Sequence, residues 1–251
     1  KETAALRRLI AEATEILSRA FSTRPDGDAV QSLIDESENA IFKVAERAHT
    51  GGVAPIAEAL QETFRRIDSR SHRGSLTGIP SGYYDLDEML CGFNAGDLVI
   101  LAARPSMGKT ALALNVFEHA ALNPPPWMEA EQPVVLAFSL EMGRQQIVSR
   151  MLCSRARVDA HKLKTGNIPS EDYSELSRAA GELSSARMFI DDTPGLSVMA
   201  MRSRARRLKQ QQKGLHLVIV DYLQLMTQPK AESRQMEISQ ISRSLKELAR
   251  E

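Results

Sequence analysis

Leu98-Val-Ile-Leu-Ala-Ala-Arg-Pro-Ser-Met-Gly-Lys-Thr110, continued by Ala111-Leu-Ala-Leu-Asn-Val-Phe117, is the stretch that decides the fold of this chain. It begins as an apolar run, passes through a loop that carries Gly108-Lys-Thr110, and continues as an alanine- and leucine-rich helix. A strand, a loop and a helix in this order form the setting in which a P-loop binds phosphate. Because both flanking elements are present, a chance Gly-Lys-Thr in a turn is the weaker interpretation. The stretch predicts a nucleotide-binding site.

The residue types of this loop suit a triphosphate. Backbone N–H groups of the loop and the start of the helix form a concave cluster of positive dipoles. Lys109 would reach the β- and γ-phosphates, the Thr110 hydroxyl would bind Mg²⁺, and Gly108 lets the backbone close tightly around the anion. Ala103 stands where the usual pattern opens with glycine, so the match is A-x4-G-K-T. The predicted nucleotide-binding residues are Ala103, Arg104, Pro105, Ser106, Met107, Gly108, Lys109 and Thr110.

Composition sets the outer limits of the interpretation. The 251 residues suffice for one large domain and an appendage, and 43% hydrophobic residues can build a core. Lys and Arg together number 32, as do Asp and Glu, so net charge argues neither for nor against nucleic acid. Cys91 and Cys153 lie outside any metal-ligand spacing, and reduced thiols indicate a cytoplasmic protein. We expect no membrane association, because no apolar run is long enough to span a bilayer.

The first 75 residues differ in pattern from the rest. Residues 1–20 and a stretch from Val30 to Val44 each have one apolar face, and a turn at 24–27 joins them into a helical hairpin. The hairpin has too few apolar residues for a core of its own. A third amphipathic stretch follows, and polar residues up to 75 then form a linker. The apolar stripe of this third stretch consists of Ile56, Leu60, Phe64 and Ile67. Spacing alone favours packing of the stripe against its own domain.

From Leu76 onward, strands and helices are predicted to alternate. The strands are expected near 97–102, 134–138, 187–191 and 216–221, and the helices near 110–122, 143–156, 170–184, 197–212 and 234–250. This alternation predicts an α/β fold, with a mostly parallel sheet covered by helices on both faces.

Two carboxylates follow predicted strands. Asp221 ends His216-Leu-Val-Ile-Val-Asp221, and in a P-loop fold an aspartate at that place positions Mg²⁺. Glu141 comes just after Val134-Val-Leu-Ala-Phe-Ser-Leu-Glu141, at the edge of the sheet where ligands bind. Glu141 has two open interpretations: it deprotonates the water that attacks the γ-phosphate, or it is a solvated side chain that caps the next helix.

Basic side chains occur on one helix face and in one loop. Arg202, Arg206, Lys209 and Lys213 lie opposite an apolar stripe, and an exposed helix packed on the sheet explains them best. In the polar loop 227–235, Lys230 and Arg234 are candidates for contact with a nucleic-acid backbone. An ordinary surface loop is the alternative.

Several blocks of sequence around these motifs are far more specific than a generic P-loop. They are Thr77-Gly-Ile-Pro-Ser-Gly82 with Asp85-Leu-Asp87, Gly96-Asp-Leu98, Ala102-Ala-Arg-Pro-Ser-Met-Gly-Lys-Thr-Ala-Leu-Ala113, Phe138-Ser-Leu-Glu-Met142, Phe189-Ile-Asp-Asp-Thr-Pro194, Val220-Asp-Tyr-Leu-Gln-Leu225 and Ile238-Ser-Gln-Ile-Ser-Arg-Ser-Leu-Lys246. Together they span nearly the whole chain, which resembles the bacterial replicative DNA helicases of the DnaB type. Ala103 at the start of the P-loop suits that family.

The resemblance implies a hexameric ring with RecA-like motor domains that hydrolyse ATP at subunit interfaces and move 5′ to 3′ on single-stranded DNA. It implies ATP and Mg²⁺ as cofactors, Glu141 and Lys109 as catalytic residues with Glu141 as the base, and Thr110 and Asp221 as metal ligands. Residues 1–48 then match the end of an N-terminal domain that contacts primase, and a helicase loader is a further expected partner. Residues 49–75 match a linker whose apolar stripe docks on the adjacent subunit, and 76–251 match the motor domain.

Two other functions remain open on the sequence. A RecA-like recombinase or clock-type ATPase shares the motor core but lacks the preceding hairpin and linker. A non-catalytic scaffold for primase or loader would use the N-terminal helices alone. The chain begins and ends inside helical patterns, which indicates a fragment. Because the resemblance places further active-site residues after Glu251, we expect this chain alone to bind nucleotide, hydrolyse it poorly and unwind no DNA.

Overall fold

The computed structural model describes residues 2–22, 76–128, 132–226 and 234–251, with isolated residues between 29 and 64. The chain divides into two compact units, residues 1–68 and 69–251. In the first unit, α1 (Glu2–Ser22) confirms the helix predicted at 1–20. Apolar side chains of α1 are exposed, most of all Phe21 at 90%. Most of the second predicted helix lies outside the described residues.

The second unit alternates helices and strands as predicted. Its elements are α4 (Tyr84–Leu90), α5 (Lys109–Leu122), β1 (Val135–Ser139), α6 (Arg144–Ala156), α7 (Ala160–Thr165), α8 (Ser170–Ser185), β2 (Met188–Asp191), α9 (Val198–Gln212), β3 (Leu217–Asp221), the short 3₁₀ helix η1 (Leu223–Leu225) and α10 (Arg234–Ala249). The five helices predicted in this unit are confirmed. The short helices α4, α7 and η1 were not predicted, because one or two turns carry little periodicity.

The sheet holds three parallel strands in the order β2-β1-β3. Each strand is followed by a helix in the chain, which is how parallel neighbours are connected. In the register, Phe138 lies opposite Asp191, and Ser139 lies opposite Asp221. All three strands therefore end at the same edge of the sheet, and the residues that follow them share that edge.

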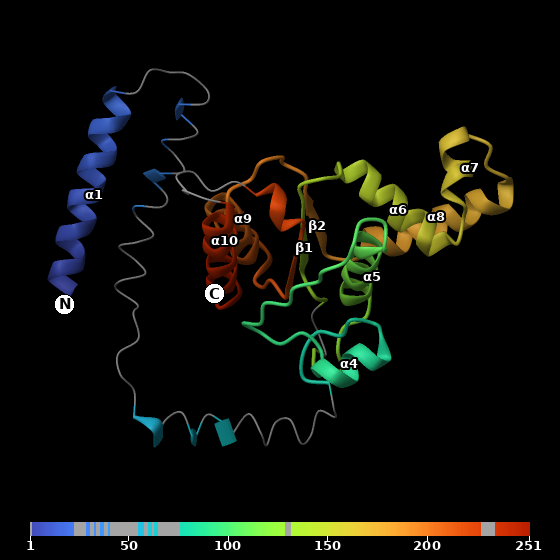
Figure 1. Cartoon of the computed structure of the whole chain (residues 1–251), viewed down its shortest axis with the longest axis horizontal. Coiled ribbons are helices and arrows are strands. Elements are labelled where there is room, and N and C mark those ends of the chain that lie inside the picture. Colours follow the sequence, from blue (N-terminus) through green and yellow to red (C-terminus); the bar gives the residue numbers. More distant parts are fainter. Residues whose placement is uncertain are drawn as a thin grey trace. The chain divides into compact units, whose positions relative to one another are not determined.

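Helices cover both faces of the sheet (Figure 1). On one face, Leu136 and Phe138 of β1 pack with Met201 of α9 and Ile241 of α10. On the other face, Val135 and Ala137 of β1 pack with side chains of α5 and α6. Successive residues of a strand point to opposite faces, so β1 supplies both cores and is buried along its whole length. The predicted fold class, a mostly parallel α/β sheet between helices, is confirmed.

The strand predicted at 97–102 does not form. Val99, Ile100 and Leu101 are instead exposed by 54%, 68% and 45%. A strand needs a neighbour to take its backbone hydrogen bonds. Within the described residues, β3 pairs with β1 alone and offers no bonded partner to this segment. An apolar, β-branched sequence was therefore not sufficient to form a strand at 97–102.

One side chain on the basic face of α9 is not exposed as predicted. The helix does pack its apolar stripe on the sheet, with Val198, Met201 and Ala205 buried. Arg202, however, is only 8% exposed and forms an ion pair with Glu251. Helical spacing places a side chain on a face, but it does not reveal that α10 ends beside that face.

None of the described helices is both long and apolar enough to cross a membrane.

Candidate nucleotide-binding site

Lys109 and Thr110, at the start of α5, meet Asp221 at the end of β3. The Thr110 hydroxyl donates a hydrogen bond of 2.8 Å to Asp221 Oδ2, and Lys109 Nζ lies 3.5 Å from Asp221 Oδ1. The Asp221 side chain is 15% exposed and that of Lys109 is 29% exposed. The sequence separates these groups by more than 100 residues, and the fold brings them into contact.

The loop before α5 has the backbone shape of an anion cradle. Gly108 immediately precedes the helix with φ 85°, and Ser106 also has a positive φ, of 65°. A Cβ at Gly108 would have open space around it, since nothing lies within 4 Å. The backbone turns back on itself through a hydrogen bond from Met107 N–H to the Arg104 carbonyl, at 3.3 Å. The space beside Gly108, at the start of α5, is therefore open, and a helix start with open space beside it is a setting that binds phosphate.

Tyr222 belongs to the same site but was not predicted. Lys109 Nζ lies 4.3 Å from the centroid of the Tyr222 ring, which places the ammonium over the aromatic face. A cation in that position is attracted by the ring quadrupole. The lysine is thus held between a carboxylate and an aromatic ring. The position of Tyr222 next to Asp221 in the chain was the available signal.

The donors at this site suit a small, hard cation. The Thr110 hydroxyl and the Asp221 carboxylate both supply oxygen, the ligand atom that Mg²⁺ prefers. In the parts of the chain that the structure describes, no three His, Cys, Asp or Glu side chains gather into a metal cage. Mg²⁺ commonly uses one or two protein oxygens together with waters and substrate phosphates. The residues present therefore fit a metal that arrives with a triphosphate.

Glu141 lies at the same edge of the sheet, two residues after the end of β1. Leu140 N–H donates a hydrogen bond of 2.8 Å to the backbone carbonyl of Asp221, which ties the two strand ends together. Glu141 itself is exposed. It does not cap α6: the cap residue is Gly143, and the Arg144 N–H goes to the carboxylate of Asp192. The structure therefore does not show the interpretation in which Glu141 caps the next helix.

Other predicted residues are placed only in part. Ala103, Arg104, Pro105 and Met107 are exposed, and none of their side chains reaches Asp221 among the contacts of the described residues. Lys230, Ile67 and the side chain of Arg234 lie outside the described residues. In the first unit, the described members of the apolar stripe are exposed: Ile56 by 77%, Leu60 by 49% and Phe64 by 62%.

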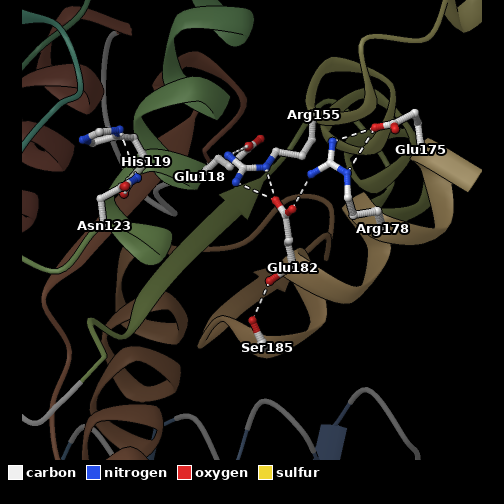
Figure 2. A network of polar contacts seen from close by, with 8 residues as sticks. All are labelled: Glu118, His119, Asn123, Arg155, Glu175, Arg178, Glu182 and Ser185. Carbon is white, nitrogen blue, oxygen red and sulfur yellow. Dashed lines mark hydrogen bonds and ion pairs between the residues drawn. The ribbon is translucent and has the colours of Figure 1, made fainter.

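An ion-pair network fixes the far half of α5 (Figure 2). Arg155 of α6 bonds to Glu118 of α5 at 3.3 Å and to Glu182 of α8 at 2.6 Å. The Glu118 side chain is 13% exposed. Burial raises its pKa, and the nearby Arg155 guanidinium only partly opposes that effect. A polar cleft of about 580 Å³ lies beside this network, between α5, α6 and α8, and does not include the P-loop.

A second attachment holds α5 against the segment before it. Asn115 of α5 donates a hydrogen bond of 2.9 Å to the Tyr83 hydroxyl. Gly82 has φ 86°, and a Cβ there would lie 2.5 Å from the ring of His119. The Asp87 carboxylate accepts bonds from the backbone N–H groups of Ser81 and Gly82, at 2.7 and 3.2 Å. The P-loop helix is therefore positioned by the turn that precedes α4 as well as by the sheet.

Comparison with known proteins agrees with this geometry. A family model described as the DnaB-like helicase C terminal domain matches residues 78–251. The replicative DNA helicase DnaC of Bacillus subtilis (strain 168) is 42% identical over 254 residues, and the replicative DNA helicase DnaB of Geobacillus stearothermophilus is 43% identical over 254 residues. Each match covers all of this chain and 54% of the relative. The chain thus spans about half the length of the curated relatives it matches.

Solved structures give the same answer. A DnaB-like replicative helicase, described with its interactions with primase, matches with a TM-score of 0.78 at 34% identity, over 99% of this chain and 55% of that one. A second solved structure, described as an ATPase domain, matches with a TM-score of 0.72 at 39% identity, over 79% of this chain and 68% of that one. The chain therefore belongs to the family of DnaB-like helicases, and its second unit has their RecA-like α/β fold.

Proposed function

We propose that the chain carries the ATP-hydrolysing motor of a replicative DNA helicase. The observation that supports this most directly is the meeting of Lys109 and Thr110 with Asp221 at the carboxyl edge of the sheet. Open α/β sheets bind their ligands at this edge. The names of the relatives, which are replicative DNA helicases, point to the same reaction.

The residues would divide the work as follows. Lys109 and the N–H groups of residues 103–110 bind the triphosphate, while Thr110 and Asp221 hold Mg²⁺. When bound, the metal neutralises charge that develops on the phosphate oxygens. Glu141, exposed at the neighbouring strand end, accepts a proton from the attacking water.

The wider assembly is part of the same proposal. Six copies form a ring that moves 5′ to 3′ on single-stranded DNA, with Lys230 and Arg234 at the DNA phosphates. Residues 1–48 belong to an N-terminal domain, residues 49–75 to a linker and residues 76–251 to the motor. The apolar stripe Ile56, Leu60, Phe64 and Ile67 docks on the adjacent motor, which would cover the three side chains found exposed. Primase and a helicase loader bind the ring, and the protein works in the cytoplasm.

The test is DNA-stimulated ATP hydrolysis by a full-length protein that carries this sequence. Lys109→Ala and Glu141→Gln should each lower kcat at least about 100-fold, the scale of a lost catalytic group. Lys162→Ala and Glu171→Gln, on α7 and α8, are matched controls that should keep full activity. Hydrolysis that survives Lys109→Ala would contradict the proposed ATP site, and a full-length protein that hydrolyses no ATP would favour a non-catalytic scaffold. If Lys109→Ala abolishes hydrolysis but Glu141→Gln does not, Glu141 is not the catalytic base and the rest of the proposal stands.

The ring is tested separately by mass. Native mass measurement of the full-length protein, with and without a non-hydrolysable ATP analogue, should give a hexamer. The nucleotide should increase the fraction of hexamer. Phe64→Ser should shift the population to smaller species, because it places a hydroxyl in an apolar contact. Phe21→Ser, the same change at an exposed phenylalanine outside the stripe, is the control. A monomer under all conditions would contradict the ring.

A further inference from the structure

Asp192, the residue that follows β2, holds the start of α6. Its Oδ2 accepts a hydrogen bond of 2.9 Å from the backbone N–H of Arg144, the first residue of that helix. Its Oδ1 accepts two bonds from the Arg144 guanidinium, from Nε at 3.0 Å and from Nη2 at 2.8 Å. One carboxylate thus binds both the backbone and the side chain of Arg144. It joins the carboxyl end of β2 to the helix that follows β1.

The turn on the other side of Glu141 is held as well. The Ser139 hydroxyl donates to the Met142 carbonyl at 2.7 Å and accepts from the Met142 N–H at 3.2 Å. Leu140 N–H is bonded to the Asp221 carbonyl. Glu141 therefore lies in a short turn that Ser139 closes by its bonds to Met142, that Leu140 ties to Asp221 before Glu141, and that Asp192 holds after it at Arg144. Its backbone has little freedom, although its side chain is exposed.

Asp192 is itself held in place by the turn that contains it. The neighbouring Asp191 accepts bonds from the N–H and the hydroxyl of Thr193, at 3.1 and 2.7 Å. Arg204 of α9 bonds to the other oxygen of Asp191 at 2.5 Å. The two consecutive carboxylates thus face different elements: Asp191 faces α9, and Asp192 faces α6.

The charge of Asp192 is retained at any pH at which proteins are normally studied. The side-chain hydrogen bonds from Arg144, and then the bond from its backbone N–H, lower the pKa of Asp192 to about 2. A carboxylate in this state can accept hydrogen bonds with both oxygens at once. In Asp192 one oxygen accepts the Arg144 N–H and the other accepts the Arg144 guanidinium, so the bond to the backbone needs only one of them.

We propose that Asp192 is a positioning residue for ATP hydrolysis: it fixes the backbone of residues 141–143 so that the Glu141 carboxylate stays at the nucleotide site. This inference rests on the proposed role of Glu141 as the base. Asp192 makes no contact with Lys109, Thr110 or Asp221 among the described contacts, so it acts through Glu141. Catalytic groups held loosely lose rate steeply, since a misplacement of about 1 Å can cost on the order of 100-fold.

The experiment compares Asp192→Ala and Asp192→Asn in the full-length protein that carries this sequence. Asp192→Ala should lower kcat for ATP about 10-fold while the affinity for a fluorescent ATP analogue stays within about twofold, because the triphosphate residues are untouched. Asp192→Asn keeps an oxygen that can accept the Arg144 N–H, and it should recover most of the lost rate. Asp172→Ala, which removes the partner of Lys162, is the control and should change neither value.

A double-mutant comparison separates positioning from a general structural effect. In a Glu141→Gln background, measured in single turnover, Asp192→Ala should cause no further loss, because the group it positions is already gone. An additional 10-fold loss there, or equal losses of kcat and affinity in Asp192→Ala alone, would overturn the positioning role while leaving the motor intact. Full hydrolysis by Glu141→Gln would instead overturn the role of the base, and this inference with it.

Discussion

The Thr110 hydroxyl donates a hydrogen bond to Asp221 Oδ2 across 111 positions of the chain. The two residues come from the start of a helix and the end of a strand, which are packed against each other through the core on one face of the sheet. Because α5 packs on β1 and β3, the first turn of the helix arrives at the carboxyl edge of the sheet. Helix-on-sheet packing thus brings together the two oxygens that we propose as ligands of one cation.

Thr110→Val tests this pair. Valine has nearly the same shape but no hydroxyl, so it removes one proposed metal ligand and leaves the backbone of the loop in place. We expect affinity for an ATP analogue in Mg²⁺ to fall about 10-fold, and affinity in EDTA to change little. The measurement is fluorescence titration under both conditions. Thr165→Val, which removes a hydroxyl bonded to a helix carbonyl on α7, is the control and should bind normally. Equal losses with and without Mg²⁺ would argue against a metal at Thr110.

Arg155→Ala should destabilise the second unit by about 1–3 kcal/mol, because it leaves the mostly buried Glu118 carboxylate without its cation. Burial raises the pKa of Glu118. The protonated form is therefore favoured in the fold, and stability falls as the pH rises through that raised pKa. Without Arg155 the pKa rises further, so the variant should lose more stability at pH 8 than at pH 5. Urea unfolding at both values measures this. Arg178→Ala, whose partners Glu175 and Glu182 are both partly exposed, should cost less stability than Arg155→Ala.

Gly82→Ala should be more damaging than Gly166→Ala, although both glycines have positive φ, of 86° and 73°. The left-handed backbone costs alanine roughly 1–2 kcal/mol at either position. At Gly82 the new Cβ would also meet the His119 ring at 2.5 Å, whereas nothing lies within 4 Å at Gly166. We expect an additional loss of about 1–3 kcal/mol at Gly82. Chemical denaturation of the two variants gives the difference, and equal losses would mean that His119 moves aside freely.

Arg144→Ala should raise the pKa of Asp192 from about 2 toward the ordinary value of an aspartate. The interaction is present above that ordinary value and is lost only as the pH falls through about 2. In the variant, the loss should begin at higher pH. Carbon-detected NMR titration of the side-chain carboxyl measures the midpoint. Asp191 is the internal control: burial would raise its pKa, but bonds from Arg204 and Thr193 lower it, and these are untouched in Arg144→Ala. A midpoint unchanged at Asp192 would contradict the pairing.

The sequence predicted those features of the site that depend on local pattern. The apolar run before Asp221 and the helix after Gly108 each fix one residue of the proposed site, and the parallel sheet brings them to one edge. Helices with a long apolar stripe were found within a few residues of their true ends. The strand at 97–102 was wrong because strand formation is decided by a partner, and a partner is not visible in local composition.

The contacts made by charged side chains were harder to foresee. Asp192 lies 48 positions from Arg144, and Arg155 lies 37 positions from Glu118. Each pair depends on which two helices, or which strand and helix, pack against each other. The sequence pattern around an acidic residue does not indicate which basic residue will pair with it. Arg202 shows the same limit, since its helical position predicted exposure and the end of α10 covers it.

One consequence of the Glu118–Arg155 pair concerns how α5 can move. Lys109 is the first residue of this helix, and Glu118 lies nine residues later, about 14 Å along its axis. A straight helix behaves as a stiff rod over such a length. If nucleotide binding or hydrolysis tilts the end of α5 at Lys109, the end at Glu118 must move by a comparable amount. That movement either shifts Arg155 and Glu182 as well or breaks the ion pairs that Arg155 forms with Glu118 and Glu182.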